Sequence, residues 1–207
     1  MGNLNSTNKV TIVTPFKAIN NAKLYQTINY LYKQNIKLIV KHLIIYDISC
    51  NNLLDIKNSF INKKNYFLEY IPTNKKGIYD AINEGFKYLK NNDYYIVIGA
   101  GDLIFLENIY EIKIKNLLFC KYKLSNKPTH LNRCRNLYSG MPYCHNAIIF
   151  KYNQIKYSNK YSICSDYDYF INFIKKEAIN IFDLDNYNDE IYIVFEAEDG
   201  ISSKSFI

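Results

Sequence analysis

The stretch KGIYDAINEGFKYLKNNDYYIVIGAGD, residues 76–102, predicts a helix followed by a buried strand. Apolar residues recur at helical spacing on one face of a helix expected over 77–92: Ile78, Ile82 and Leu89. Ala81 and Gly85 are small enough for this helix to pack closely on its neighbour. A run of strand formers then ends in Gly-Ala-Gly and Asp102. A helix leading into such a strand is the repeating unit of a parallel sheet.

The same alternation extends in both directions along the chain. Strands are expected at 10–16, 39–47, 66–71 and 145–150. Helices are expected at 22–34, around 52–62 and at 165–176, the last with Ser165 or Asp166 as its cap. Beyond about residue 106 the alternation weakens, and residues 121–142 are expected to form a long loop. The pattern predicts an α/β fold with a mostly parallel sheet and helices on both faces.

Three of the expected strands end in residues that suit a ligand site. In open α/β sheets, ligands bind beyond the carboxyl ends of the strands. Pro15, Asp47 and Asp102 each lie where a strand ends. We therefore expect three loops to converge at this edge of the sheet, two of them carrying carboxylates.

Two explanations fit Gly99-Ala100-Gly101. A dinucleotide-binding loop requires G-x-G-x-x-G, but position 104 is isoleucine and this strand is the fourth expected, not the first. The alternative is a tight turn at a strand end, in which the glycines leave Asp102 uncrowded. The sequence favours the turn. Because aspartate after glycine is common in turns, this feature alone does not establish a metal ligand.

The composition is that of a globular protein with an excess of basic residues. The chain has 207 residues, is 48% hydrophobic and carries a formal net charge of +7 spread along its length. This charge favours an anionic partner such as a nucleotide or an acidic membrane surface. A nucleic-acid partner is not expected, because the aromatic residues lie in apolar runs and do not alternate with basic ones. Five cysteines without a CxxC pair argue against a disulfide framework or a zinc site and predict a reducing, cytoplasmic location.

The motifs, taken in order, resemble those of the bacterial glycosyltransferases of family 2, which have the GT-A fold. In that family a G-I-Y-D-A-hydrophobic-N-x-G helix precedes a strand that ends in an Asp-containing metal motif, as in residues 76–102. Further matches follow the family order: VTIVTPF (10–16), HLIIYDISCNN (42–52), GMPYCHNAIIF (140–150), SICSDYDYFINF (162–173) and DGISS (199–203).

The resemblance implies a single GT-A-type domain over residues 1–207, a Rossmann-like three-layer sandwich with a mostly parallel central sheet. Residues from about 9 to 105 would bind the nucleotide sugar, and residues from about 106 to 207 would bind the acceptor.

On the donor side, the resemblance assigns roles to motif positions. Asp47 would hydrogen-bond the nucleotide base, and Thr14 and Pro15 would line the same pocket. Asp80 matches a donor-binding position, although an acidic residue in the first turn of a helix is also stabilising by itself.

The resemblance also places the metal and the diphosphate. Asp102 would bind Mn²⁺ or Mg²⁺ bridging the diphosphate of the donor, because these hard cations prefer carboxylate and phosphate oxygens. Gly101 would leave room for that diphosphate. The metal would neutralise the leaving group as a Lewis acid.

On the acceptor side, Asp166 would be the general base, with Asp168 as the competing candidate and a plain helix cap as the alternative role for Asp166. His145 would contact substrate, or else be a hydrogen-bonded, half-buried histidine. Arg133 and Arg135 are the only arginines, and either could bind the diphosphate or an anionic acceptor in a bidentate way.

The sequence departs from the family pattern at three places. The metal motif usually has two acidic residues, and here only Asp102 remains. Lys75 replaces an acidic residue that often precedes the G-I-Y-D string, which bears on nucleotide selectivity. Glu-Asp-Gly stands before Ile-Ser-Ser where the family has Gly-Gly.

The resemblance implies an inverting, metal-dependent glycosyltransferase of polysaccharide biosynthesis. It would move a sugar from a nucleotide-diphosphate sugar, a UDP-sugar in the first instance, to a hydroxyl of a bacterial surface glycan or a lipid-linked acceptor. Peripheral contact with the inner membrane face would suit the positive charge. Two alternatives are a catalytically weakened nucleotide-sugar-binding module and a sugar nucleotidyltransferase. The second would need a glycine-rich loop after the first strand, and TPFKAINNAK (14–23) contains no glycine.

Overall fold

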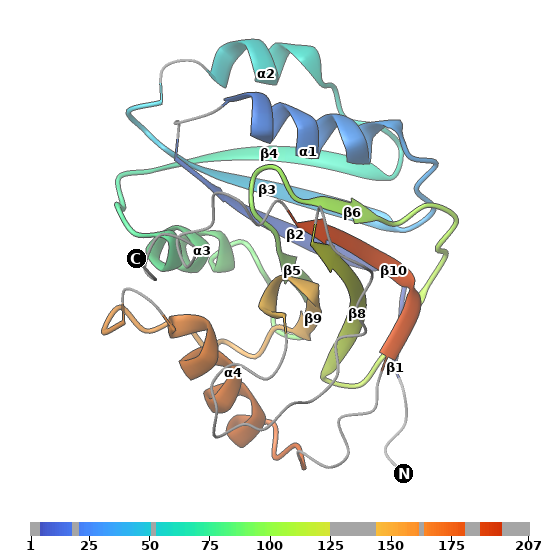
Figure 1. Cartoon of the computed structure of the whole chain (residues 1–207), viewed down its shortest axis with the longest axis vertical. Coiled ribbons are helices and arrows are strands. Elements are labelled where there is room, and N and C mark those ends of the chain that lie inside the picture. Colours follow the sequence, from blue (N-terminus) through green and yellow to red (C-terminus); the bar gives the residue numbers. More distant parts are fainter. Residues whose placement is uncertain are drawn as a thin grey trace.

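The computed structural model of the chain describes residues 5–17, 21–50, 53–124, 144–161, 164–180 and 187–195. Its strands are β1 (Asn5–Thr7), β2 (Lys9–Phe16), β3 (Ile39–Asp47), β4 (Tyr66–Thr73), β5 (Tyr94–Val97), β6 (Leu103–Phe105), β7 (Ile112–Ile114), β8 (Leu117–Leu124), β9 (Ile148–Lys151) and β10 (Tyr187–Phe195). Its helices are α1 (Asn21–Lys33), α2 (Leu54–Ser59), α3 (Ile78–Phe86), α4 (Ser165–Lys176) and the short 3-10 helix η3 (His145–Ala147). Figure 1 shows their arrangement.

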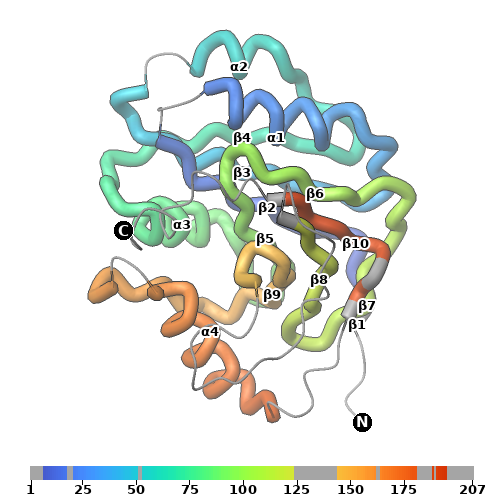
Figure 2. The backbone as a smooth tube through the Cα atoms, in the orientation of Figure 1, coloured from blue at the N-terminus to red at the C-terminus, as the bar shows by residue number. Residues whose placement is uncertain are grey.

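An eight-stranded sheet has the order β4-β3-β2-β5-β9-β8-β10-β6. Strands β4, β3, β2 and β5 are parallel to one another, and β10 is parallel to β8. Strand β9 is antiparallel to both β5 and β8, and β6 is antiparallel to β10. A separate ribbon joins β1 to β7, near the beginning of the chain in Figure 2. The predicted α/β class with a mostly parallel sheet is therefore confirmed.

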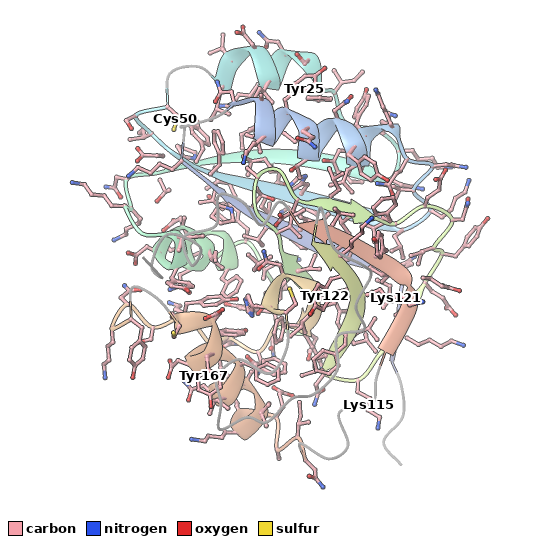
Figure 3. The ribbon with its side chains drawn as sticks, viewed as in Figure 1. Tyr25, Cys50, Lys115, Lys121, Tyr122 and Tyr167 are labelled. Carbon is pink, nitrogen blue, oxygen red and sulfur yellow. The ribbon has the colours of Figure 1, made fainter. Side chains whose placement is uncertain are left out.

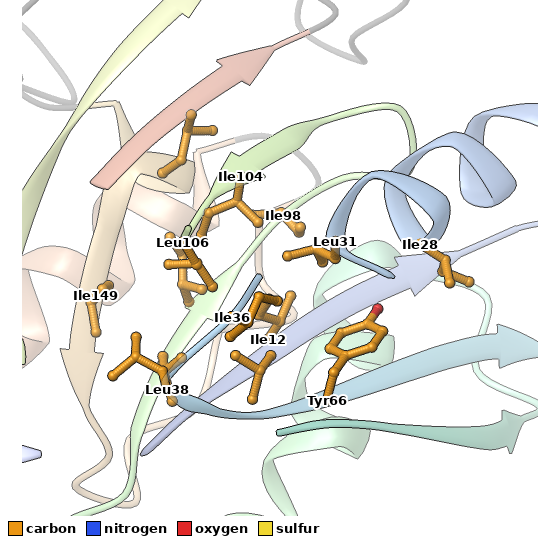
Figure 4. Packing of buried hydrophobic residues seen from close by; sticks show 14 of the residues in the cluster. Ile12, Ile28, Leu31, Ile36, Leu38, Tyr66, Ile98, Ile104, Leu106 and Ile149 are labelled. Atoms are coloured by element: carbon orange, nitrogen blue, oxygen red, sulfur yellow. The ribbon is translucent and has the colours of Figure 1, made fainter. Parts of the chain in front are cut away.

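Helices cover both faces of the sheet, as predicted (Figure 1). Apolar residues of β2 and β3 pack against α1 on one face: Val10, Ile12, Val40 and Ile44 against Leu24, Ile28 and Leu31. Their neighbours in the strands pack against α3 and α4 on the other face: Val13, Leu43 and Ile45 against Ala81, Ile82, Phe86, Phe170 and Phe173. Side chains fill the space between the layers (Figure 3), and Figure 4 shows the first core closely. Alternation along each strand sends successive side chains to opposite cores.

Helix α3 lies unusually close to the sheet. A Cβ atom on Gly85 would lie 2.9 Å from Val13 Cγ1 and 3.2 Å from Ile45 Cδ1, so only glycine allows this approach. The predicted close packing is confirmed. The helix ends at Phe86, earlier than the predicted residue 92, yet Leu89 is still buried in the turn that follows.

Two other predicted elements differ from those observed. The segment 145–150 was predicted as a strand, but its first part forms η3, in which the N–H of Ala147 bonds to the carbonyl of Cys144, and β9 follows. The predicted cap of α4 by Ser165 or Asp166 is wrong. The N-cap is Cys164, with a left-handed φ of 72° and no side-chain capping bond.

Candidate functional site

A cavity of about 310 Å³ lies at the carboxyl edge of the parallel strands. Its walls come from the ends of β2, β3 and β4 and from the beginning of α3: Pro15, Phe16, Lys17, Asp47, Thr73, Lys75, Lys76, Gly77, Ile78 and Ala81. Strand β2 continues one residue past Pro15, which pairs with Ile45. This is the edge at which the sequence predicted that loops converge.

The cavity combines one carboxylate with three lysines. Asp47 Oδ1 accepts hydrogen bonds from the N–H of Ser49 at 2.9 Å and from its hydroxyl at 2.7 Å. These bonds, with smaller contributions from Lys17 and Lys76, lower the pKa of Asp47 below its ordinary value. Asp47 is therefore an anionic hydrogen-bond acceptor at neutral pH, surrounded by cationic groups.

Helix α3 begins at the cavity, and the carboxylate of Asp80 in its first turn lies beside the N-cap residue. Its N-cap, Gly77, has no side chain to satisfy the first N–H groups of the helix. Unpaired N–H groups and the helix dipole favour anions at such an end. Asp80 already supplies an anion at this helix end, so the attraction of the cavity for phosphate groups comes from its three lysines.

Asp102 follows β5 in a tight turn, as predicted. The N–H of Asp102 bonds to the carbonyl of Gly99 at 3.2 Å, and Gly101 has a φ of 103°, a conformation that favours glycine. The chain then continues into strand β6 and not into a helix, which excludes the dinucleotide loop.

The side chain of Thr27 on α1 holds this turn in place through two hydrogen bonds. Its hydroxyl donates to the carbonyl of Asp102 at 2.9 Å and accepts the N–H of Gly101 at 2.8 Å. Sequence reasoning missed Thr27. The available signal is a threonine on the buried face of α1, between Leu24 and Leu31.

The carboxylate of Asp102 is only 7% exposed. Its Oδ2 atom accepts the N–H of Gly99 at 2.7 Å and the side-chain amide of Asn146 at 3.2 Å. A Cβ atom on Gly99 would lie 3.0 Å from that oxygen, so the glycine makes room for the carboxylate itself. Asn146 is a second residue that sequence reasoning missed, although it lies beside His145 in a quoted motif.

Asp166 and Asp102 come together around Cys144. Burial raises the pKa of Cys144 to about 12, and the nearby charges of Asp102 and Asp166 add to this shift. Asp166 also lies close to His145, where burial lowers the pKa of the imidazole to about 4 and the carboxylate partly opposes this effect. Asp102 and Asp166 are thus both near enough to influence Cys144, and Asp166 is near enough to influence His145.

Asp166 lies in the first turn of α4, next to Tyr167, which Figure 3 labels. Its Oδ1 atom accepts the N–H of Tyr167 at 2.9 Å. The hydroxyl of Tyr79 on α3 accepts the N–H groups of Ser165 and Asp166, and burial raises the pKa of Tyr79 to about 12. Tyr79 therefore holds the beginning of α4, a role that the sequence did not reveal.

The remaining predicted residues have other surroundings. Thr14 is fully buried and is not part of the cavity wall; its hydroxyl lies 2.9 Å from His42 Nε2. Asp80 Oδ1 accepts the amide of Asn159 at 2.7 Å. Arg133 and Arg135 lie outside the described residues.

Solved structures of similar fold include S. aureus TarS 1–349 in complex with UDP-GlcNAc, with a TM-score of 0.66 and 14% identity over 96% of this chain and 62% of that one. The same fragment with UDP has a TM-score of 0.62 and 15% identity, covering 90% of this chain and 60% of that one. The chain has a GT-A fold. For S. aureus TarS itself the TM-score is 0.60 with 16% identity, over 92% of this chain and 35% of that one.

At these identities the likeness shows the fold and nothing finer. The chain spans about a third of TarS and less than two thirds of its shorter fragment. No protein-family model matches the sequence, and a search of curated proteins finds no match. Within the part of the chain that the structure describes, no helix is long and apolar enough to cross a membrane.

Proposed function

We propose that this chain is a nucleotide-sugar glycosyltransferase that moves a sugar from a UDP-sugar to a hydroxyl of a bacterial surface glycan or lipid-linked acceptor. The observation that carries the proposal is a basic cavity at the carboxyl edge of the parallel strands of a GT-A sheet. Asp102 follows β5, the next parallel strand, and both Asp102 and Asp166 influence Cys144 electrostatically. Two of the similar solved structures hold UDP or UDP-GlcNAc, which supports this choice of donor.

The donor would bind in the cavity beside Asp47. The ionised carboxylate would accept an N–H of the base, and Lys17, Lys75 and Lys76 would attract the diphosphate. Lys75 contributes a positive charge at a position where the resembling family often has an acidic one. The nucleotide preference therefore has to be measured.

A divalent cation would be held by Asp102. A carboxylate is a suitable ligand for Mg²⁺ or Mn²⁺, and phosphate oxygens of the donor would complete the shell. Among the described residues no group of three metal-ligating side chains occurs, so the protein itself supplies few ligands. When bound, the cation would neutralise charge on the leaving diphosphate.

Asp166 would act as the general base. It would take the proton of the acceptor hydroxyl while that oxygen forms a bond to the anomeric carbon and the bond to the nucleoside diphosphate breaks on the opposite face. A single displacement of this kind inverts the anomeric configuration. Family 2 membership, the inverting course, peripheral contact with the inner membrane face and a cytoplasmic location are parts of the same proposal.

Calorimetric titration with UDP and GDP, with and without Mn²⁺, tests the donor site. Asp102→Ala is expected to abolish the Mn²⁺-dependent part of nucleotide binding, whereas Asp55→Ala, on the exposed side of α2, is expected to leave it unchanged. Equal Mn²⁺-dependent affinity in Asp102→Ala and the unmodified chain would refute the metal role of Asp102.

Release of UDP from UDP-GlcNAc tests the base. Asp166→Asn is expected to reduce turnover by about 10² or more with donor binding intact. The matched control is Asp168→Asn, which removes the rival carboxylate two positions away, where Asp168 Oδ2 accepts the amide of Asn172. If Asp168→Asn shows the loss and Asp166→Asn does not, the base is Asp168.

A nucleotide-sugar-binding module is the second candidate function. The observation that favours it is the single carboxylate at the metal position. Metal-independent UDP binding, with no hydrolysis or transfer from any UDP-sugar, would establish this second candidate in place of the first.

A further inference from the structure

Tyr157 is held between the two helices of the site. Both of its backbone groups pair with the side chain of Asn83 on α3: the N–H donates to Asn83 Oδ1 at 2.9 Å, and the carbonyl accepts from Asn83 Nδ2 at 2.9 Å. The carbonyl of the next residue, Ser158, accepts the hydroxyl of Ser165 on α4 at 2.8 Å. The backbone of Tyr157 is therefore fixed from both sides.

The ring of Tyr157 is fixed as firmly as its backbone. It stacks on Tyr79 with centroids 5.5 Å apart and on Tyr169 with centroids 4.3 Å apart, at interplanar angles of 16° and 15°. The side chain is 3% exposed, and burial raises its pKa well above the ordinary value. The hydroxyl thus stays protonated and keeps one direction.

That hydroxyl makes a short hydrogen bond to Nε2 of His145. The other ring nitrogen of His145, Nδ1, is buried and has no hydrogen-bond partner within the described part of the chain. An unmatched buried polar atom is costly and calls for an explanation.

Counting hydrogens decides which nitrogen carries the proton. If Tyr157 donates to Nε2, only the N–H at Nδ1 of His145 is left unmatched. If Nε2 carried the proton, both the hydroxyl hydrogen of Tyr157 and the lone pair at Nδ1 would be unmatched. The first arrangement leaves fewer buried groups unsatisfied and is therefore favoured.

We infer that Tyr157 is a positioning residue that fixes His145 as the Nδ1–H tautomer, so that Nδ1 presents a neutral N–H donor to a substrate oxygen. The functional part of this inference rests on the proposed glycosyltransferase activity, whereas the tautomer does not. His145 lies beside Asp166, where the acceptor hydroxyl and the donor phosphates would meet. Both provide oxygen atoms able to accept a hydrogen bond.

The tautomer can be measured without any substrate. Long-range ¹H–¹⁵N spectra distinguish the two neutral imidazole tautomers, and the chain has only three histidines, so His145→Gln assigns the signal. We expect the Nδ1–H form in the unmodified chain at pH 7. The Nε2–H form there would overturn the inference, whatever any variant does.

Tyr157→Phe removes the hydroxyl and retains the stacked ring. We expect His145 to lose the single Nδ1–H form. Turnover of UDP-GlcNAc should then fall about tenfold, because the N–H donor of His145 is no longer held in position. The affinity for UDP should stay within about twofold, because the nucleotide cavity is unchanged. Tyr169→Phe is the matched control: it removes a neighbouring hydroxyl that bonds to Tyr95 and not to His145. We expect this control to leave the tautomer of His145 and the turnover of UDP-GlcNAc unchanged.

The two readouts separate this inference from the proposed function. A chain that shows the Nδ1–H tautomer but binds no UDP would refute the function and retain the tautomer. Tyr157→Phe with an unchanged tautomer and unchanged turnover would overturn the inference even if UDP binds. Addition of UDP shows which substrate oxygen accepts the hydrogen bond from Nδ1–H. A shifted Nδ1–H signal identifies a phosphate oxygen, and an unshifted signal with UDP bound identifies the acceptor hydroxyl.

Discussion

His42, which is buried, and His145, which is half-buried, each bond to a tyrosine, but they differ at the second ring nitrogen. His42 lies on β3, between β4 and β2, with Nδ1 at 2.7 Å from the hydroxyl of Tyr66 and Nε2 at 2.9 Å from that of Thr14. His145 begins η3 at the site, with Nε2 on Tyr157 and Nδ1 unmatched within the described chain.

The difference separates a histidine that maintains the fold from one that serves the site. A buried polar group in a core is stable only when all of its hydrogen-bonding atoms are paired. His42 meets this condition and is fully buried. His145 does not meet it, and its position beside Asp166 explains what the unmatched atom is for.

Replacing each histidine by phenylalanine is the strongest test of this comparison. His42→Phe leaves the buried hydroxyls of Thr14 and Tyr66 without partners, which should cost about 3–4 kcal/mol of unfolding free energy. His145→Phe leaves one hydroxyl unpaired and also removes the unmatched nitrogen, so we expect a loss of about 1 kcal/mol or less. Urea unfolding measures the unfolding free energy of both variants. Equal losses would show that the two histidines do not differ in their contribution to stability.

Acid should destabilise the folded chain through both histidines. Burial lowers the pKa of His42 from 6.5 to about 3, so the unfolded chain binds a proton that the folded chain does not. Stability is unaffected by His42 above pH 6.5 and decreases as the pH falls from 6.5 towards 3. Burial also lowers the pKa of His145, to about 4, so the two histidines act in the same direction. Between pH 6.5 and 4.5 we expect a loss of about 2 kcal/mol from each, so that His42→Phe and His145→Phe each retain about half of the loss of the unmodified chain. Unfolding curves at the two pH values measure these losses; a loss in His42→Phe as large as that of the unmodified chain would contradict the contribution of His42.

Thr14→Val would make the surroundings of His42 like those of His145, with one ring nitrogen unmatched. We expect a loss of about 1–2 kcal/mol and a UDP affinity within about twofold of the unmodified chain, because Thr14 is not part of the cavity wall. Thermal unfolding and calorimetric titration measure the two effects. A tenfold weaker affinity for UDP would instead establish Thr14 as a nucleotide contact, as the sequence predicted.

Much of the fold could be predicted, because apolar periodicity is a local property. The strand at 39–47 agrees with β3 to the residue, and α4 occupies the predicted 165–176. The helix at 77–92 was predicted too long, since Leu89 continues the apolar spacing inside a turn. The cap of α4 was missed because a cysteine with a left-handed backbone carries no capping signal.

Less of the site could be predicted. The rule that ligands bind beyond the carboxyl ends of strands correctly placed Pro15 and Asp47 at the cavity. Thr14 is the neighbour of Pro15, but alternation along β2 turns it to the opposite face, towards His42. The bonds of Thr27 to the turn at Asp102 join residues more than seventy positions apart, and no local pattern reveals such contacts.

The turn at residues 99–102 has a consequence for redesign. Gly99 is required by its contact with the carboxylate of Asp102, and Gly101 is required by its backbone angle, so two of the four positions accept no other residue without moving that carboxylate. The exposed lysines at 75 and 76 carry no such constraint. If the proposed donor site is correct, changes of nucleotide preference should be sought at those lysines, while the turn is left as it is.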